Sequence, residues 1–193
     1  KVKLDLRDVT LDASQTPKSQ TDAKVPQQSL FQNLLTTIHA MRRDGNQSLD
    51  IDLDLSRTTM NGQDVTALAE VLPQCKVSSL ALSDNKIGDE GATAIANALP
   101  RCSSLTSLNL RNTKIGDDGA RAIANALPNS PLTSLNLRFN EIKDNGVIAI
   151  AQAVPASKLT SLDLRGNEIR RAHTKVRATQ IAQQGPNPPT VYF

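Results

Sequence analysis

Hydrophobic residues recur along the chain with a period of 27 or 28 residues. The pair Leu-x-Leu occurs as Leu53/Leu55, Leu80/Leu82, Leu108/Leu110, Leu135/Leu137 and Leu162/Leu164, and successive first leucines are 27, 28, 27 and 27 residues apart. Within one unit, such as residues 105–127, LTSLNLRNTKIGDDGARAIANAL, apolar positions first alternate as in a strand and then follow a helical spacing. Each unit therefore predicts a short strand, a turn and a helix, and the fixed period predicts a solenoid.

The segment that follows each strand has a common pattern. Gly88-Asp89, Gly116-Asp117 and Asp144-Asn145 each introduce a helix, and their acidic residues suit the positive end of the helix dipole. Glycines recur shortly afterwards at Gly91, Gly119 and Gly146, and we expect them to allow close packing of helix against strand. Each helix is expected to end at a proline, namely Pro73, Pro100, Pro128 or Pro155.

The two ends of the chain are less regular than its middle. We expect a single domain over 1–193, in which 1–48 form an irregular N-terminal repeat or cap, 49–169 the regular repeats, and 170–193 a capping helix and tail. Residues 1–11 fit a strand with Leu4 in the place of Leu53, residues 12–27 are polar and predict a flexible loop, and 29–41 predict a helix. The tail GPNPPTVYF is expected to be extended and mobile, or else to fold back over an apolar edge.

Four segments carry a family resemblance. VSSLALSDNKI, LTSLNLRNTKI, LTSLNLRFNEI and LTSLDLRGNEI resemble the leucine-rich-repeat consensus L-x-x-L-x-L-x-x-N-x-L, and the period together with IGDEGATAIANALP resembles the ribonuclease-inhibitor subtype. The resemblance implies an α/β leucine-rich-repeat solenoid, a curved horseshoe arc with parallel strands on the concave face and helices on the convex face. It also implies that Asn85, Asn140 and Asn167 bind the backbone of the adjacent coil. Thr58 and Thr113 stand at this position in two repeats, and Thr113 is expected to weaken the ladder.

The same resemblance implies a protein–protein interaction module that binds a partner protein through its concave face. The Ala-rich units are similar to those of effectors that pathogens deliver into host cells, which implies a host protein partner and a cytoplasmic location in the host. Two alternatives stay open: a GTPase-activating regulator, and the substrate-recognition arm of a larger enzyme such as a ubiquitin ligase. The chain lacks an initiator Met and opens within a strand pattern, so we interpret it as a fragment of a larger protein.

Composition narrows the class of partner. Aromatic residues make up 2% of the chain and Trp is absent, which disfavours base-stacking platforms for nucleic acid. The net charge of +3 is too small to indicate a nucleic-acid or membrane partner, and no long apolar run predicts a membrane span. We expect a monomer with a protein partner. Cys75 and Cys102 occupy the same repeat position, which predicts small buried thiols.

The sequence contains no pattern typical of catalysis. His39 has no second ligand at metal-binding spacing, and the serines at 79, 107, 134 and 161 recur with the period, so they are strand positions. We therefore expect no enzyme activity and no cofactor.

Positions that vary between repeats are the candidate binding residues. Arg111, Arg138 and Arg165 fall in one column, and neighbouring strands lie about 4.8 Å apart, so the three arginines would form a ladder. Their mutual repulsion, roughly 0.8 kcal/mol per pair in water, is tolerable, and Asp163 can pair with Arg165. We expect this column to accept an acidic partner surface; a merely solvated charged face is the alternative. The predicted partner-binding set is Asp52, Asp54, Asn109, Arg111, Asn136, Arg138, Phe139, Asp163 and Arg165, with Phe139 as an aromatic anchor.

Overall fold

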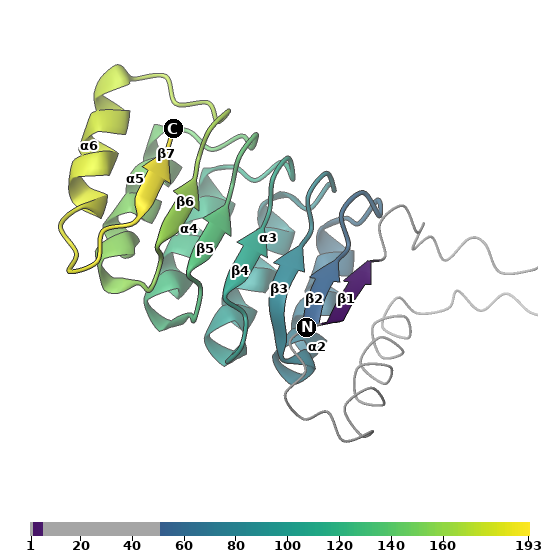
Figure 1. Ribbon diagram of the computed structural model, residues 1–193. Coiled ribbons are helices and arrows are strands. Elements are labelled where there is room, and N and C mark those ends of the chain that lie inside the picture. The colour runs from purple at the N-terminus through teal and green to yellow at the C-terminus, as the bar shows by residue number, and fades with distance from the viewer. Residues whose placement is uncertain (1, 6–50) are drawn as a thin grey trace, which may run out of the picture.

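The structure, a computed structural model, describes residues 2–5 and 51–193, which form one parallel sheet with a row of helices (Figure 1). The sheet has seven strands in chain order: β1 Val2–Asp5, β2 Ile51–Asp54, β3 Val77–Ala81, β4 Ser107–Asn109, β5 Ser134–Asn136, β6 Ser161–Asp163 and β7 Thr190–Tyr192. The helices are α2 Gly62–Cys75, α3 Gly88–Ala98, α4 Asp117–Ala126, α5 Asp144–Ala153 and α6 Ala172–Ala182.

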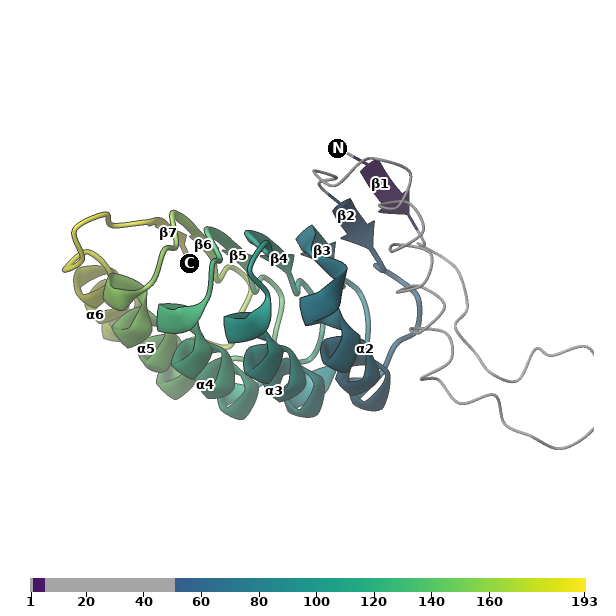
Figure 2. The same cartoon turned by 90° about the horizontal axis from the view of Figure 1, so that it is seen from below.

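The strands lie along one side of the molecule and the helices along the other (Figure 2). Neighbouring parallel strands lie about 4.8 Å apart, whereas packed helices need about 8–10 Å between their axes. The row therefore bends with the sheet on its inner, concave side. This arrangement confirms the predicted α/β solenoid.

The repeats stack in the register that the leucine period predicts. Leu4 pairs with Leu53, and the same column continues through Leu80, Leu108, Leu135 and Leu162. From Leu53 onwards, both leucines of every Leu-x-Leu pair are buried in one continuous core that extends to Ala182 at the end of α6. Each repeat thus buries its apolar side chains mainly against its neighbours.

The predicted asparagine ladder connects three turns, those of Asn85, Asn140 and Asn167, to the turn before each of them. The Asn140 amide oxygen accepts hydrogen bonds from the backbone N–H groups of Thr113 and Ile115, both at 3.0 Å. Its nitrogen donates to the carbonyls of Leu110 and Leu137 at 2.7 and 3.0 Å. Asn85 makes the corresponding four bonds, and Asn167 makes three of them.

The expectation that Thr113 weakens the ladder is confirmed, because among the described residues its side chain bonds only Leu110 and Asn140 and does not reach the turn of Asn85. The turn that contains Thr113 is nevertheless regular. The Thr113 side chain is buried and donates to the Leu110 carbonyl at 2.8 Å, while its own N–H is held by Asn140. Asn112, just before it, has φ +54°, close to the +59° of Asp84 and the +56° of Phe139 in the neighbouring turns. The turn keeps its shape because the next repeat supplies the amide.

A second ladder, made by aspartates, joins the helix N-termini. The Asp89 carboxylate accepts from the N–H groups of Gly116 and Gly119 at 2.7 and 2.9 Å, and Asp117 accepts from Lys143 and Gly146 at 2.8 and 2.9 Å. Each aspartate therefore caps the helix of the following repeat, a role beyond the dipole effect predicted from the sequence.

The recurring glycines Gly119 and Gly146 have a different role from the one predicted. A Cβ atom at Gly119 would lie 2.6 Å from Asp89 Oδ1 and 2.9 Å from Ala92 Cβ, both in the preceding repeat. A Cβ atom at Gly146 would meet Asp117 and Ala120 in the same way, at 2.6 and 3.0 Å. These two glycines allow helix to approach helix, not helix to approach strand as predicted, because the aspartate cap requires the two backbones to come close.

The prolines do not end the helices directly. Pro73 lies inside α2, and the other three prolines lie in short 3₁₀ turns that continue α3, α4 and α5, namely Leu99–Arg101, Leu127–Asn129 and Val154–Ala156. Proline is tolerated at the start of a helical turn because the N–H that it lacks has no partner there.

The C-terminal tail is ordered as a strand, so its predicted mobility is wrong and the alternative, that it folds back, is confirmed. Val191 pairs with Leu162, and the Thr190 N–H donates to the Thr160 carbonyl at 3.0 Å. Phe193 is partly buried against the core. Strand β6 holds the tail because its edge offers backbone groups that need partners.

Several predicted segments lie outside the described residues: residues 6–11 of the first strand, the loop 12–27, the helix 29–41 with His39, and positions 49 and 50 of the acidic strand. Among the residues that the structure describes, no helix has both the length and the apolar character needed to cross a membrane.

Replacing Asn140 by Ala should lower the free energy of unfolding by about 1–3 kcal/mol, because it leaves buried backbone groups of two turns without partners. Urea unfolding measures this difference. The control is Asn145→Ala, an exposed asparagine in the first turn of α5, which should change stability by less than about 0.5 kcal/mol. Equal stability of the two variants would contradict the proposed role of the ladder.

Candidate functional site: the concave strand ends

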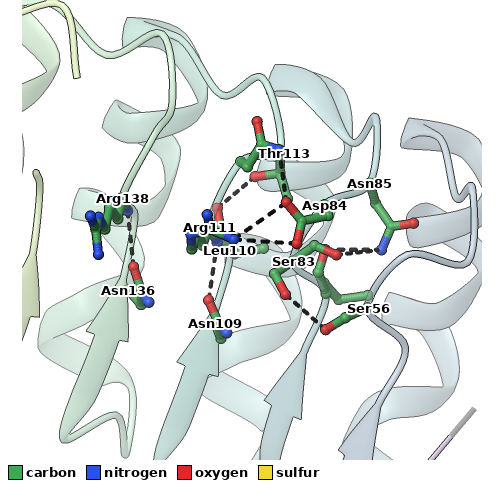
Figure 3. Close-up of polar contacts among 12 residues, drawn as sticks. Ser56, Ser83, Asp84, Asn85, Asn109, Leu110, Arg111, Thr113, Asn136 and Arg138 are labelled. Atoms are coloured by element: carbon green, nitrogen blue, oxygen red, sulfur yellow. Dashed lines mark hydrogen bonds and ion pairs between the residues drawn. The ribbon is translucent and has the colours of Figure 1, made fainter. Parts of the chain in front are cut away.

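In β2, β4, β5 and β6, the side chain of the last strand residue accepts a hydrogen bond from the backbone N–H two residues later and so organises the concave surface. Asn109 accepts from the Arg111 N–H at 3.1 Å, and Asn136 accepts from the Arg138 N–H at 3.0 Å (Figure 3). Asp54 and Asp163 do the same for Ser56 and Arg165. Asn109 and Asn136 belong to the predicted partner-binding set. Their side-chain oxygens bond the turn and fix the backbone that carries the arginines.

Arg111 is paired within the molecule. Its guanidinium lies 3.3 Å from Asp84, which stands one repeat earlier on the concave side (Figure 3). The Asn112 amide also donates to Asp84, at 2.8 Å. Asp84 therefore compensates the charge of Arg111, and the sequence columns gave no sign of this contact because the two residues fall in different columns.

Arg165 is paired with Asp163, as predicted. Its terminal nitrogen lies 2.6 Å from one carboxylate oxygen of Asp163, and its Nε lies 3.0 Å from the other. Partial burial favours a higher pKa of the Asp163 carboxyl, but the hydrogen bonds and positive charge of Arg165, with the charge of Arg138, outweigh it and lower this pKa below its ordinary value.

Arg138 differs from the other two arginines. Within the part of the chain that the structure describes, it forms no ion pair, and its Nε is buried without a hydrogen-bond partner. Its guanidinium carbon lies 4.4 Å from the centre of the Phe139 ring, and that of Arg111 lies 5.1 Å from the same ring. Both distances are within the range of a cation–π interaction.

Phe139 is held by the next repeat although it is 42% exposed. A Cβ atom at Gly166 would lie 2.2 Å from the Phe139 ring, so the absence of a side chain at Gly166 makes room for the ring. The two residues are neighbours in one predicted column, yet their fit depends on side-chain direction, which the sequence pattern does not specify.

Tyr192 extends this surface and was missed by sequence reasoning. It is 44% exposed on β7, beside Asp163 in register, and the guanidinium carbon of Arg165 lies 5.1 Å from its ring centre. The expectation of a mobile tail removed Tyr192 from consideration. Together, Arg111, Arg138, Phe139, Arg165 and Tyr192 form what we call the cation–aromatic cluster.

The other end of the concave face is hollow and has small side chains. A hollow of about 300 Å³ is lined by Asp54, Ser56, Arg57, Ala81, Ser83, Asp84 and Asn109. Ala81 leaves space because it stands where other strands end in Asn or Asp, and the Ser83 hydroxyl donates to Ser56 at 2.8 Å (Figure 3). Asp52 and Asp54 lie on β2 at this end, away from Arg165, as the predicted polarity requires.

The buried cysteines contribute nothing to this surface. Cys75 and Cys102 are buried and unbridged, as predicted, and burial raises the pKa of the Cys102 thiol to about 11. No group of three or more His, Cys, Asp or Glu residues is placed to hold a metal ion in the described ranges.

Comparison with known proteins shows what the repeats are similar to. Residues 74–96, 101–124, 129–151 and 156–170 match the family described as Leucine Rich repeat. A solved structure titled Leiomodin-1 Actin-Binding Site 2 is similar at 26% sequence identity with a TM-score of 0.51. The match covers 54% of this chain and 64% of that one, so the chain spans less than two thirds of that neighbour's length. No curated protein matches the chain in sequence.

Replacing Arg165 by Gln should raise the pKa of Asp163 towards its ordinary value, because the charged hydrogen bonds that lower it are lost. A lowered carboxyl pKa stabilises the folded state above the ordinary pKa of Asp, and this contribution disappears as the pH falls through the folded-state pKa. Carboxyl ¹³C shifts in NMR titrations of the wild type and the variant measure the change. An unchanged Asp163 titration would contradict the assigned ion pair.

Proposed function

We propose that this chain, which is built of leucine-rich repeats, binds a partner protein through the concave face of its sheet, with the cation–aromatic cluster as the contact surface. The observation that carries the proposal is Phe139, an aromatic ring that is 42% exposed and yet fixed in place by Gly166 and two arginines. Arginine and aromatic side chains dominate the energetics of protein interfaces.

Rigidity of the cluster supports a binding role. The backbone N–H groups of Arg111, Arg138 and Arg165 donate hydrogen bonds to the strand-end side chains, so less conformational entropy is lost when a partner docks. A solvated surface without a partner gives no reason for Gly166 to make room for the exposed ring of Phe139. This contrast favours binding over the alternative of a charged surface without a partner.

The finer assignments stay predictions. They are the ribonuclease-inhibitor subtype, an effector role on a host protein, and the two alternatives of a GTPase-activating regulator and a recognition arm of a ubiquitin ligase. Stimulated hydrolysis by candidate GTPases tests the regulator, and the sequence of the full-length gene tests the recognition arm.

Actin is a second candidate partner, on the basis of the similarity to the solved structure titled Leiomodin-1 Actin-Binding Site 2. Co-sedimentation with actin filaments and gel filtration with monomeric actin test it directly. If actin is the partner, Arg138→Glu should abolish the association, and absence of association with the wild-type chain in both assays removes this candidate.

Reversing the charge of Arg138 should weaken binding of the partner protein by at least about tenfold, because a cation without an internal ion pair would become an anion at the interface. Quantitative proteomics of material captured from a eukaryotic lysate on wild-type and Arg138→Glu protein identifies the partner, and calorimetry with the purified pair gives the affinity. Arg177→Glu, an equal charge change on the exposed surface of α6, should bind as the wild type does.

Phe139→Ala supplies the second arm of this test and should also weaken binding. Melting temperatures of the arginine variants should stay within about 2 °C of the wild type, because surface substitutions rarely change stability by more than about 0.5 kcal/mol. A partner that binds Arg138→Glu and Phe139→Ala as tightly as it binds the control Arg177→Glu would exclude the cation–aromatic cluster as its contact surface.

A further inference from the structure

We propose that the cation–aromatic cluster recognises a single carboxylate side chain of a partner protein at Arg138, with an adjacent apolar side chain packed on Phe139. This inference rests on the proposed function, because it names the chemistry of the group that the concave face would accept. The sequence predicted three arginines that each bind an acidic group of the partner. In this proposal, Arg138 alone binds one.

The first argument is the unequal compensation of the three arginines. Asp84 lies 3.3 Å from Arg111, and Asp163 lies 2.6 Å from Arg165. Arg138 lies between these two pairs in the strand order and forms no ion pair with any described residue. An incoming carboxylate therefore gains most at Arg138, because the nearest internal carboxylate that acts on it, Asp163, forms its ion pair with Arg165 instead.

The second argument is the geometry of the Arg138 side chain. Its guanidinium stacks on the Phe139 ring at 4.4 Å, and its Nε is buried and has no acceptor. Because Nε is covered, the terminal nitrogens are the atoms that a partner carboxylate would meet. The stack limits the orientations of the guanidinium, which favours a hydrogen-bonded contact with one carboxylate over a diffuse attraction.

The third argument is the charge balance of the face, which disfavours a polyanion such as a nucleic acid. In strands β2 to β6 and the three residues after each, four arginines (57, 111, 138, 165) stand with four aspartates (52, 54, 84, 163). Nucleic-acid binding draws its affinity from many phosphate contacts with uncompensated cations. A balanced face with one uncompensated arginine fits a protein segment that carries one acidic side chain.

The exposed ring specifies the second element of the ligand. Phe139 presents 42% of its surface beside Arg138, and Tyr192 presents 44% beside Arg165. Apolar side chains next to the carboxylate would cover these rings and remove water from the ion pair, which strengthens it. The recognised segment is therefore acidic and apolar at neighbouring positions.

Selection from a random dodecapeptide library displayed on phage tests the inference on the full chain. We expect peptides selected on wild-type protein to share one Asp or Glu with an apolar neighbour, and peptides selected on Arg138→Glu to carry Lys or Arg at that position. Arg177→Glu is the matched control and should select the wild-type pattern. Against the selected peptides, Arg138→Gln should reduce affinity at least about tenfold and Arg165→Gln by less than about threefold.

The outcomes separate the inference from the proposed function. Peptides whose binding is lost in Phe139→Ala but unchanged in Arg138→Gln would overturn the carboxylate anchor and leave the concave face as the binding surface. Peptides unaffected by both substitutions, or a library without any enrichment, would count against both proposals. Tight binding of a fluorescent single-stranded oligonucleotide at physiological salt, lost in Arg138→Gln, would replace the protein segment by a polyanion.

Discussion

Three turns of the regular array, those of Thr58, Thr113 and Asn140, are completed by the next repeat, whose asparagine side chain supplies hydrogen bonds to their backbone. The amide of Asn140 binds backbone groups on both sides of the junction between two turns, and Asn85 and Asn167 repeat this at other junctions. Buried backbone groups without partners cost free energy, so a repeat separated from its neighbour would be destabilised. The solenoid is held together by this dependence as well as by its leucine core.

The aspartates extend the same dependence to the helices. Asp89 and Asp117 cap the following helix, and Asp144 continues the series. A hydrogen bond from Thr174 and backbone bonds from Arg170 and Arg171, just before α6, lower the pKa of Asp144. The glycines at the helix starts allow the caps to reach their targets, because any side chain there would strike the aspartate. Two ladders, one at the turns and one at the helix starts, therefore fix the spacing of the repeats.

This fixed spacing creates the concave surface. Left-handed backbone at Asp84, Asn112 and Phe139, together with strand-end hydrogen bonds at Asn109 and Asn136, fixes the backbone from which the side chains of the central turns project. Three arginines in register could have formed a uniformly basic strip. They do not, because Asp84 and Asp163 compensate two of them and leave Arg138 stacked on an aromatic ring. The asymmetry of the surface arises from single substitutions on a regular framework.

The sequence alone determined the period, the alternation of strand and helix, the register of the leucines, the asparagine ladder and the column that contains the three arginines. Except for the ladder, these features depend on short-range periodicity, which recurs in each unit; the ladder follows from the resemblance of the turns to the leucine-rich-repeat consensus. The tertiary structure decided what depends on contacts between units: the helix-capping role of Asp89, the fit of Phe139 over Gly166, the partner of Arg111, and the ordering of Tyr192 in β7. Such contacts join side chains about one period apart whose directions follow from packing, and a linear pattern does not encode direction.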